Sequence, residues 1–255
     1  MANPPLTREQ VLEELRFLTT VEHAVIVEDL SLYCALGHDL PADDGGATTQ
    51  QGSAARDQGL ALAQGAMFRY KALQLALVEA GGDPELGRAT SVSSDSVPET
   101  PLGPPDAAQL ERFLARAQAI ATAVEERYAK LLPAVTSDPV FEDPLLEHVR
   151  AIVVEDAPTH TASLVDLRTL LPDGVPAGLL RATRRQASNA FEQRMLDASD
   201  RIYDLVLSTL REQFEHTDFF VARSFRSLAE REMTSLDDIN RLLVQRGLLP
   251  AFTLP

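Results

Sequence analysis

Apolar and polar positions follow a helical period through most of this chain. In the stretch that begins at Leu12, apolar residues recur at spacings of three and seven, at Leu15, Leu18, Val25 and Leu32. Such spacing places these side chains on one face of a helix. No segment shows the sustained period-two alternation that indicates a half-buried β-strand. The pattern therefore predicts an all-α protein.

Capping residues and glycines between the apolar stretches predict where the helices begin and end. Thr7 and the glutamine three residues later form a capping-box pattern, and Gly37 and Gly81 are typical of helix ends. Residues 38–57 are rich in Gly, Asp, Thr and Gln, and residues 89–106 in Ser and Pro, so we expect two loops there. The expected helices lie at about 7–35, 58–80, 107–132, 144–158, 160–171, 177–214, 217–232 and 235–246.

Two carboxylates interrupt the apolar face of the first expected helix. Glu22 and Asp29 stand one heptad apart, in the gaps of the stripe that contains Leu18, Val25 and Leu32. A carboxylate among apolar neighbours must be paired, hydrogen-bonded or bound to a metal. The sequence therefore predicts a helical bundle with a polar centre.

Composition narrows the classes of partner. The 255 residues are 45% hydrophobic, which supports a real core. The net charge of −15 disfavours nucleic acid and anionic membrane surfaces as partners. Cys34 is the only cysteine, so an internal disulfide is excluded. We find neither a signal-peptide pattern nor an apolar run long enough for a membrane span, and we expect a cytoplasmic protein.

Three stretches carry a resemblance to a known family. Residues 20–33, 76–84 and 198–210 are similar to the first, second and closing helices of the ferritin-like domain in violacein and rebeccamycin pathway proteins, the iminophenyl-pyruvate dimer synthase family. The likeness implies a ferritin-like four-helix bundle over residues 1–214, with residues 215–255 as a helical extension that packs on it. It also implies a role in secondary metabolism.

The family's metal ligands are incomplete in this chain. Counting back from the Gly81 turn, the Glu-x-x-His pair of the family's second helix falls on Ala66 and Arg69. The resemblance places the family's third-helix glutamate at Glu155 and its following histidine at Leu164. A di-iron site needs about four carboxylates and two histidines, so we expect no metal here. We expect Arg69 to occupy the metal's place and to pair with Glu22, Glu155 or both.

These residues suggest a metal-free enzyme that acts on a small molecule. An arginine with carboxylates can anchor an anionic group and move protons, which suits cyclisation, isomerisation, dehydration or decarboxylation. The loops at 38–57 and 89–106 are candidate lids, and the C-terminal helices with the apolar tail 248–252 are a candidate homodimer interface. The candidate catalytic residues are Glu22, Glu155 and His160, and the candidate substrate-binding residues are Arg69, Tyr70 and Asp29.

Two alternatives stay open at this point. One keeps a metal, with iron as the cofactor of an oxidase that has a non-standard ligand set drawn from Glu22, Asp29, Glu155, Asp156, His23 and His160. The other is a non-catalytic binding or scaffold protein, in which the buried charges serve only structure.

Overall fold

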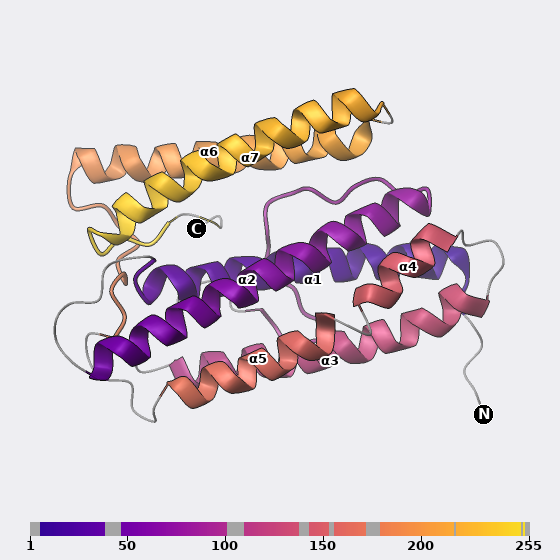
Figure 1. The fold of residues 1–255 in the computed structure, drawn as a ribbon, viewed down its shortest axis with the longest axis horizontal. Coiled ribbons are helices and arrows are strands. Elements are labelled where there is room, and N and C mark those ends of the chain that lie inside the picture. The colour runs from indigo at the N-terminus through magenta and orange to yellow at the C-terminus, as the bar shows by residue number, and fades with distance from the viewer. Residues whose placement is uncertain are drawn as a thin grey trace.

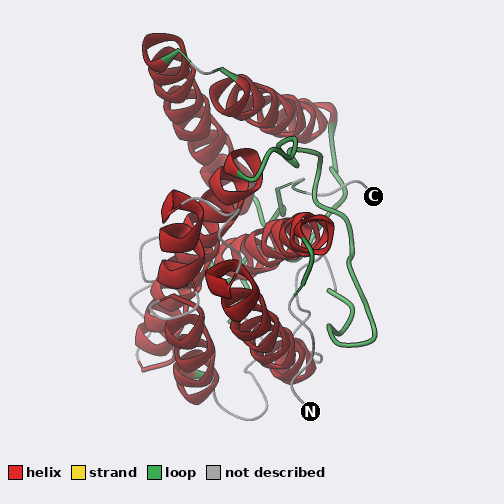
Figure 2. Ribbon diagram, turned by 90° about the vertical axis from the view of Figure 1, so that its right-hand side faces the viewer, coloured by secondary structure: helices red, strands yellow, loops and turns green. Residues whose placement is uncertain are grey.

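The protein is described from a computed structural model. It covers residues 6–38, 47–100, 110–137, 143–152, 156–171, 179–216, 218–250 and 252. Across these ranges every regular element is a helix, as Figure 2 shows, and a single isolated bridge joins Arg184 to Leu248. The prediction of an all-α protein is confirmed. The helices are α1 (Arg8–Ala35), α2 (Ala47–Glu79), α3 (Leu110–Ser137), α4 (Asp143–Ala151), α5 (Ala157–Leu170), α6 (Ala190–Glu215) and α7 (Phe219–Val244).

Helix α1 begins and ends as its sequence predicts. The backbone N–H of Gln10 donates to the Thr7 hydroxyl at 3.3 Å. The backbone N–H of Thr7 donates to the side-chain oxygen of Gln10 at 2.9 Å, which completes the capping box. Gly37, just beyond the helix end, has a φ of 118°, a conformation that glycine adopts without steric cost. Gly81 ends α2 in the same way, with a φ of 84°.

Four helical positions form the bundle, and two further helices form a hairpin beside it (Figure 1). Helix α1 packs along α2, while α3 packs with α4 and α5, which share the fourth position as two consecutive segments. Helices α6 and α7 pack mainly on each other and lie across α1 and α2. This arrangement differs from the expected one, in which residues 198–210 closed the bundle and only residues 215–255 lay outside it.

Helix α2 begins about ten residues earlier than its composition indicates. Its first turns contain glycine and threonine, which have low helix propensity. Packing compensates, because Ala55 is fully buried and Gly52 lies so close to Leu179 that an added Cβ would come within 3.1 Å of its Cδ1 atom. The predicted loop over 38–57 is therefore wrong for residues 47–57, and residues 39–46 lie outside the described residues.

Two other helix boundaries also differ from expectation. The helix expected from residue 177 begins at Ala190, because Asn189 caps it and residues 179–189 pack as an irregular strap against the end of α7. The two helices expected over 217–246 are one helix, α7. Thr234 and Ser235 lie where the two expected helices met, and their hydroxyls donate to carbonyls four residues earlier, so they remain satisfied inside the helix.

The C-terminal tail packs inside its own chain. Leu248, Leu249 and Phe252 are all nearly inaccessible to solvent and belong to clusters that include residues of α1, α6 and α7. These three side chains are therefore buried within the protein, Ala251 lies outside the described residues, and the homodimer stays a prediction. No helix within the described ranges is long and apolar enough to cross a membrane.

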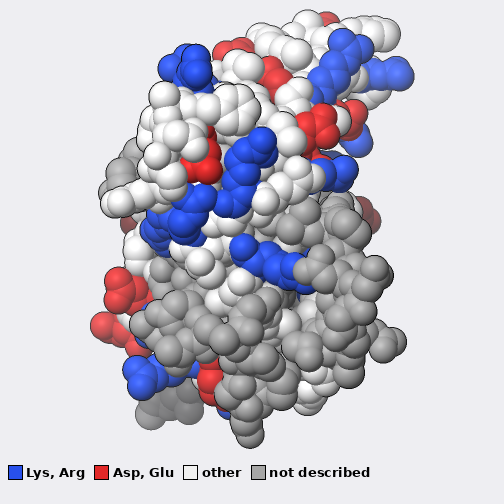
Figure 3. Space-filling view, turned by 90° about the vertical axis from the view of Figure 1, so that its left-hand side faces the viewer, with Lys and Arg blue, Asp and Glu red and all other residues white. Residues whose placement is uncertain are grey.

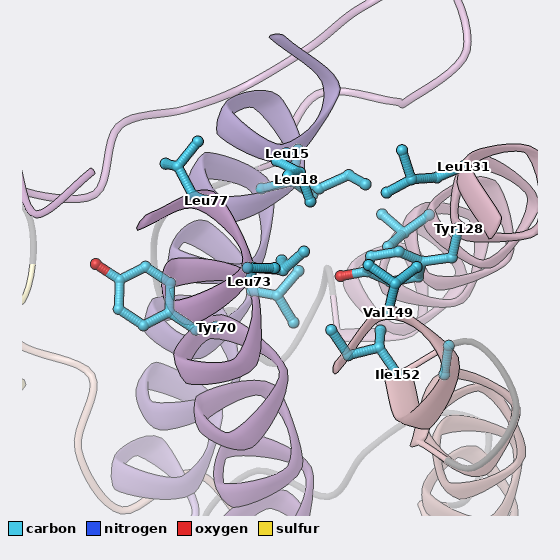
Figure 4. Close-up of a cluster of buried hydrophobic side chains, with 14 of the residues drawn as sticks. Leu15, Leu18, Tyr70, Leu73, Leu77, Tyr128, Leu131, Val149 and Ile152 are labelled. Carbon is cyan, nitrogen blue, oxygen red and sulfur yellow. The ribbon is translucent and has the colours of Figure 1, made fainter. Parts of the chain in front are cut away.

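The bundle core has two apolar levels. One cluster, drawn in Figure 4, gathers Leu15 and Leu18 of α1 with Leu73 of α2, and with side chains of α3 and α4. A second cluster gathers Leu32 of α1 with Leu62 of α2, and with side chains of α3 and α5. Glu22 and Asp29 therefore lie on the stretch of α1 that joins these two levels.

Candidate functional site

Glu22 is the centre of a buried hydrogen-bond network. Its side chain is 1% exposed, and Arg69 of α2 is 3% exposed. Arg69 Nε donates to Glu22 Oε1 at 2.9 Å, and the hydroxyl of Tyr128, from α3, donates to the same oxygen at 2.7 Å. On the other side, Arg69 Nη2 lies 3.0 Å from Nδ1 of His160 on α5. All four positions of the bundle therefore contribute one polar side chain to the network.

The charge states follow from these contacts. A guanidinium only donates, so His160 Nδ1 accepts and the proton of the neutral imidazole is on Nε2. Burial, reinforced by the charge of Arg69, holds the pKa of His160 well below its usual value. Burial alone would lower the pKa of Arg69, but the charge and hydrogen bond of Glu22, with Tyr128 and Asp29, together outweigh it and the pKa is raised. The network holds one ion pair, one neutral imidazole and one phenol.

Three buried carboxyl oxygens on α1 have no donor among the described residues. They are Glu22 Oε2, Glu28 Oε1 and Asp29 Oδ2. Burial is the main cause that raises the pKa of Asp29 to about 8; the charge of Glu22 adds to it and that of Arg69 opposes it. Burial and then the charge of Asp29 raise the pKa of Glu28 well above its usual value. A buried acceptor without a partner costs about 1–3 kcal/mol, so these atoms are available to a donor.

Tyr70 and His23 lie in a different place from the network. The Tyr70 hydroxyl donates to the Glu85 carbonyl at 2.9 Å, and Figure 4 shows it pointing away from Tyr128. His23 Nε2 shares a 2.7 Å hydrogen bond with the Tyr203 hydroxyl of α6, and burial lowers the pKa of His23 to about 4. Both side chains belong to the contact between the bundle and the hairpin. The structure does not bring Tyr70 to Arg69, where a substrate-binding role was expected.

Glu155, the other expected carboxylate, lies outside the described residues. Its position in the chain falls between α4 and α5, whereas the third helix, α3, ends at Ser137. The matching of Glu155 to the family's third-helix glutamate therefore stays a prediction. Leu164, matched to the following histidine, is a buried member of the second apolar cluster, one turn beyond His160.

The bundle geometry gives a different correspondence with a two-metal site. Such sites take one Glu from each of two helices and a Glu-x-x-His pair from each of the other two. Glu22 on α1 faces Tyr128 on α3, while Arg69 and His160 meet from α2 and α5. Three residues before each of the latter stands a buried alanine of the same core cluster, Ala66 and Ala157. The six positions are thus Glu22, Tyr128, Ala66, Arg69, Ala157 and His160.

This donor set does not fit a two-metal carboxylate centre. Alanines stand where bridging carboxylates are required, and a guanidinium that cannot lose its proton stands where an imidazole would bind. No group of three or more His, Cys, Asp or Glu side chains suited to a metal ion occurs in the described part of the chain. Of the side chains considered for a non-standard set, His23 faces the hairpin instead of Glu22.

Tyr128 is the member of the site that the sequence analysis missed. It lies in an amphipathic helix where a tyrosine at an apolar position is ordinary, so no local pattern marks it. The available signal was the pairing of helices. Ala66-x-x-Arg69 and Ala157-x-x-His160 have the same spacing on opposite helices, and α3 then has to supply the residue opposite Glu22.

Comparison with known proteins supports the fold and nothing narrower. No protein-family model matches the chain, and no curated protein matches it. A crystal structure described as a ferritin-like protein from Caulobacter vibrioides matches with a TM-score of 0.60 and 13% identity, over 99% of this chain and 100% of that chain. The narrower likeness to the violacein and rebeccamycin pathway family finds no support in these comparisons. The chain has a ferritin-like, all-α fold.

Proposed function

We propose that the bundle core is a metal-free acid–base site for a small organic molecule. One observation carries the proposal: Glu22 holds Arg69 and Tyr128 through Oε1 and leaves its other oxygen, Oε2, buried without a donor. A carboxylate that is held in place by hydrogen bonds to one oxygen, while its other oxygen is free to accept a proton, has the arrangement of a general base. The reaction class is proton transfer, as in an isomerisation, dehydration, cyclisation or decarboxylation.

The chemistry of the substrate follows from what the site lacks. The positive charge of Arg69 is already balanced by Glu22, so it has little capacity to anchor a second anion. The unpartnered oxygen of Glu22 is an acceptor, so a hydroxyl or amine group of the substrate is needed to satisfy it. Asp29, with its pKa at about 8, is protonated at neutral pH and supplies the complementary acid. We propose a neutral or cationic substrate that carries hydrogen-bond donors.

The proposed roles keep Glu22 as a catalytic residue and change those inferred from sequence for Asp29, Arg69 and His160. Glu22 acts as the base, Asp29 as an acid that also contacts the substrate, and Tyr128 with Arg69 orients Glu22. Neutral His160 holds Arg69 in place. The resemblance to the violacein and rebeccamycin pathway family further suggests that the reaction belongs to natural-product biosynthesis.

The first test is elemental analysis of protein expressed with iron and manganese supplied. We expect less than a tenth of a metal ion per chain, both in the wild type and in Glu22→Ala. One or two metal ions per chain, lost in Glu22→Ala, would overturn the proposal and restore an oxidase. Elemental analysis measures the bound metal itself, so the substrate need not be known.

The second test is hydrogen exchange into small hydroxy and amino compounds in D2O, followed by NMR with chelator present. We expect at least one compound of this class to exchange a C–H proton, with the rate at least a hundredfold lower in Glu22→Gln. The exposed Asp95→Asn serves as a matched control and should leave the rate unchanged. Exchange that is equal in wild type and Glu22→Gln contradicts the assignment of the base.

A further inference from the structure

The outer face of α7 has a groove that the proposed core site does not use. Its volume is about 470 Å³. The residues that line it recur at spacings of three and one along a single helix, which places them on one face. They are Phe220, Arg223, Ser224, Ser227, Leu228 and Arg231.

The groove is part of an unusually apolar exposed surface. Phe220 is 76% exposed and the neighbouring Phe219 is 69% exposed. Among the described residues, eight of the eleven large exposed hydrophobic side chains belong to α6 and α7. Phe220 and Leu228 belong to the groove itself. Exposed apolar surface of this kind is typical of interaction sites.

The hairpin also differs from the bundle in charge. Residues 179–255 contain eleven Lys and Arg and eleven Asp and Glu, so their formal charge is zero and the whole −15 lies in residues 1–178. Figure 3 shows basic and acidic side chains interspersed over the upper part of one end face, where the hairpin lies. The hairpin helices themselves, with the turn between them, contain seven Arg and eleven Asp and Glu over residues 190–244, a formal charge of −4. An acidic partner is therefore attracted by local arginines of α7 and not by the net charge of the hairpin.

Two arginines give the groove a specific charge pattern. Arg223 and Arg231 have no carboxylate within ion-pair distance among the described residues, although acidic residues outnumber basic ones by 38 to 23. Arg226, between them, is paired with Glu230 at 3.0 Å. Eight residues of helix span about 12 Å, so the two guanidinium groups stand on one face two turns apart.

Two serines form the bottom of the groove between its larger apolar and arginine side chains. Ser224 donates its hydroxyl to the Phe220 carbonyl at 2.9 Å, so it needs no external partner. With Ser227 it leaves a hollow between Phe220 and Leu228. A side chain on a second helix fits such a hollow, because helices pack by inserting ridges into grooves.

We propose that this face of α7 binds an amphipathic helix of another protein. The partner helix has an apolar residue that enters the hollow at Ser224 and Ser227, and two carboxylates about eight residues apart that pair with Arg223 and Arg231. A second copy of this chain is a poor occupant of the same groove. A two-fold contact would place both copies' Arg223 and Arg231 along one shared seam without carboxylates to pair with them.

The experiment uses the full chain and two synthetic helical peptides of about 20 residues. Both peptides have the same leucine stripe; one has two glutamates eight residues apart beside it, and the other has lysines there. We expect the glutamate peptide to bind the wild type saturably by calorimetry. Binding should weaken at least tenfold in Arg223→Glu/Arg231→Glu, and this variant should instead bind the lysine peptide. Arg194→Glu/Arg201→Glu, at two exposed arginines of α6, makes the same change in net charge and should behave as wild type.

Three outcomes would overturn the proposal. The first is no saturable binding of the glutamate peptide at about 1 mM, or equal binding of both peptides. The second is a homodimer in sedimentation that becomes monomeric in Arg223→Glu/Arg231→Glu. The third is binding to phosphatidylserine vesicles that this variant loses and the glutamate peptide does not compete for.

Discussion

Replacing Glu22 by glutamine is expected to lower the free energy of unfolding by about 3–5 kcal/mol. The substitution keeps the shape and the acceptor oxygen for Tyr128 and Arg69, and it removes the negative charge alone. Arg69 then becomes a buried cation without a counter-charge, since its remaining contact is with neutral His160. Breaking one partner of a buried ion pair has a cost of this size because the other charge stays desolvated. Urea unfolding at pH 7 measures it.

A matched substitution separates this effect from the general loss of a carboxylate. Glu230 pairs with Arg226 at 3.0 Å on the exposed side of α7, so Glu230→Gln should change stability by less than about 0.5 kcal/mol. Arg69→Met in the Glu22→Gln background should recover a large part of the loss, since no uncompensated charge remains. A Glu22→Gln effect below about 1 kcal/mol would mean that water reaches Arg69, and that the core site is open rather than dry.

The polar centre was predictable because it breaks a strong local pattern. Glu22 and Arg69 each interrupt an apolar stripe on a long helix, and a buried charge requires an opposite charge nearby. The structure joins them at 2.9 Å. Glu22 was a candidate partner because α1 and α2 are consecutive helices, which usually pack along each other, as they do here. The same reasoning had no basis for choosing between Glu22 and Glu155 as the partner.

Other parts of the site and fold depend on tertiary packing that no local pattern reveals. Tyr128 reaches Glu22 only because α3 lies opposite α1, and a tyrosine on an apolar face is otherwise an ordinary core residue. Residues 198–210 resemble a closing bundle helix in composition. Their helix, α6, instead packs on α7, whose continuity through Thr234 and Ser235 depends on hydroxyls that bond within the helix.

The hairpin changes how the core site is connected to the rest of the molecule. His23 follows Glu22 directly on α1 and shares a hydrogen bond with Tyr203 of α6. Arg88, in the crossing segment between α2 and α3, pairs with both Asp200 and Asp204 of α6 at 2.6 Å. Helix α1 therefore has Glu22 on the face toward the bundle core and His23 on the face toward the hairpin. A partner helix bound to α7 would therefore bind the hairpin, and the same hairpin contacts His23, the residue that follows the proposed base Glu22.

Asp29→Asn is expected to change the pH dependence of stability more than any other single substitution considered. The pKa of Asp29 is about 8 in the folded protein, against an ordinary value of 3.8. Between these values the native state holds a proton that the unfolded state has lost, so stability falls as the pH rises. The buried histidines act in the opposite direction, because their lowered pKa values make stability increase with pH up to about 6.5. The Asp29 effect is therefore resolved between pH 6.5 and 8.

Between pH 6.5 and 8 the free energy of unfolding of the wild type should fall by about 1–2 kcal/mol relative to that of Asp29→Asn. The reason is that a difference of one bound proton between the native and unfolded states changes stability by about 1.4 kcal/mol per pH unit. Glu28 contributes with the same sign in both proteins, and the charge of Asp29 adds to the rise of its pKa. The difference between the two urea-unfolding series therefore measures Asp29 together with its effect on Glu28. Asp95→Asn, an exposed carboxylate, should follow the wild type throughout. Parallel curves for wild type and Asp29→Asn would mean that Asp29 is ionised and compensated in the native state. It would then have no proton to donate at neutral pH, and the acid of the proposed reaction would have to be another group.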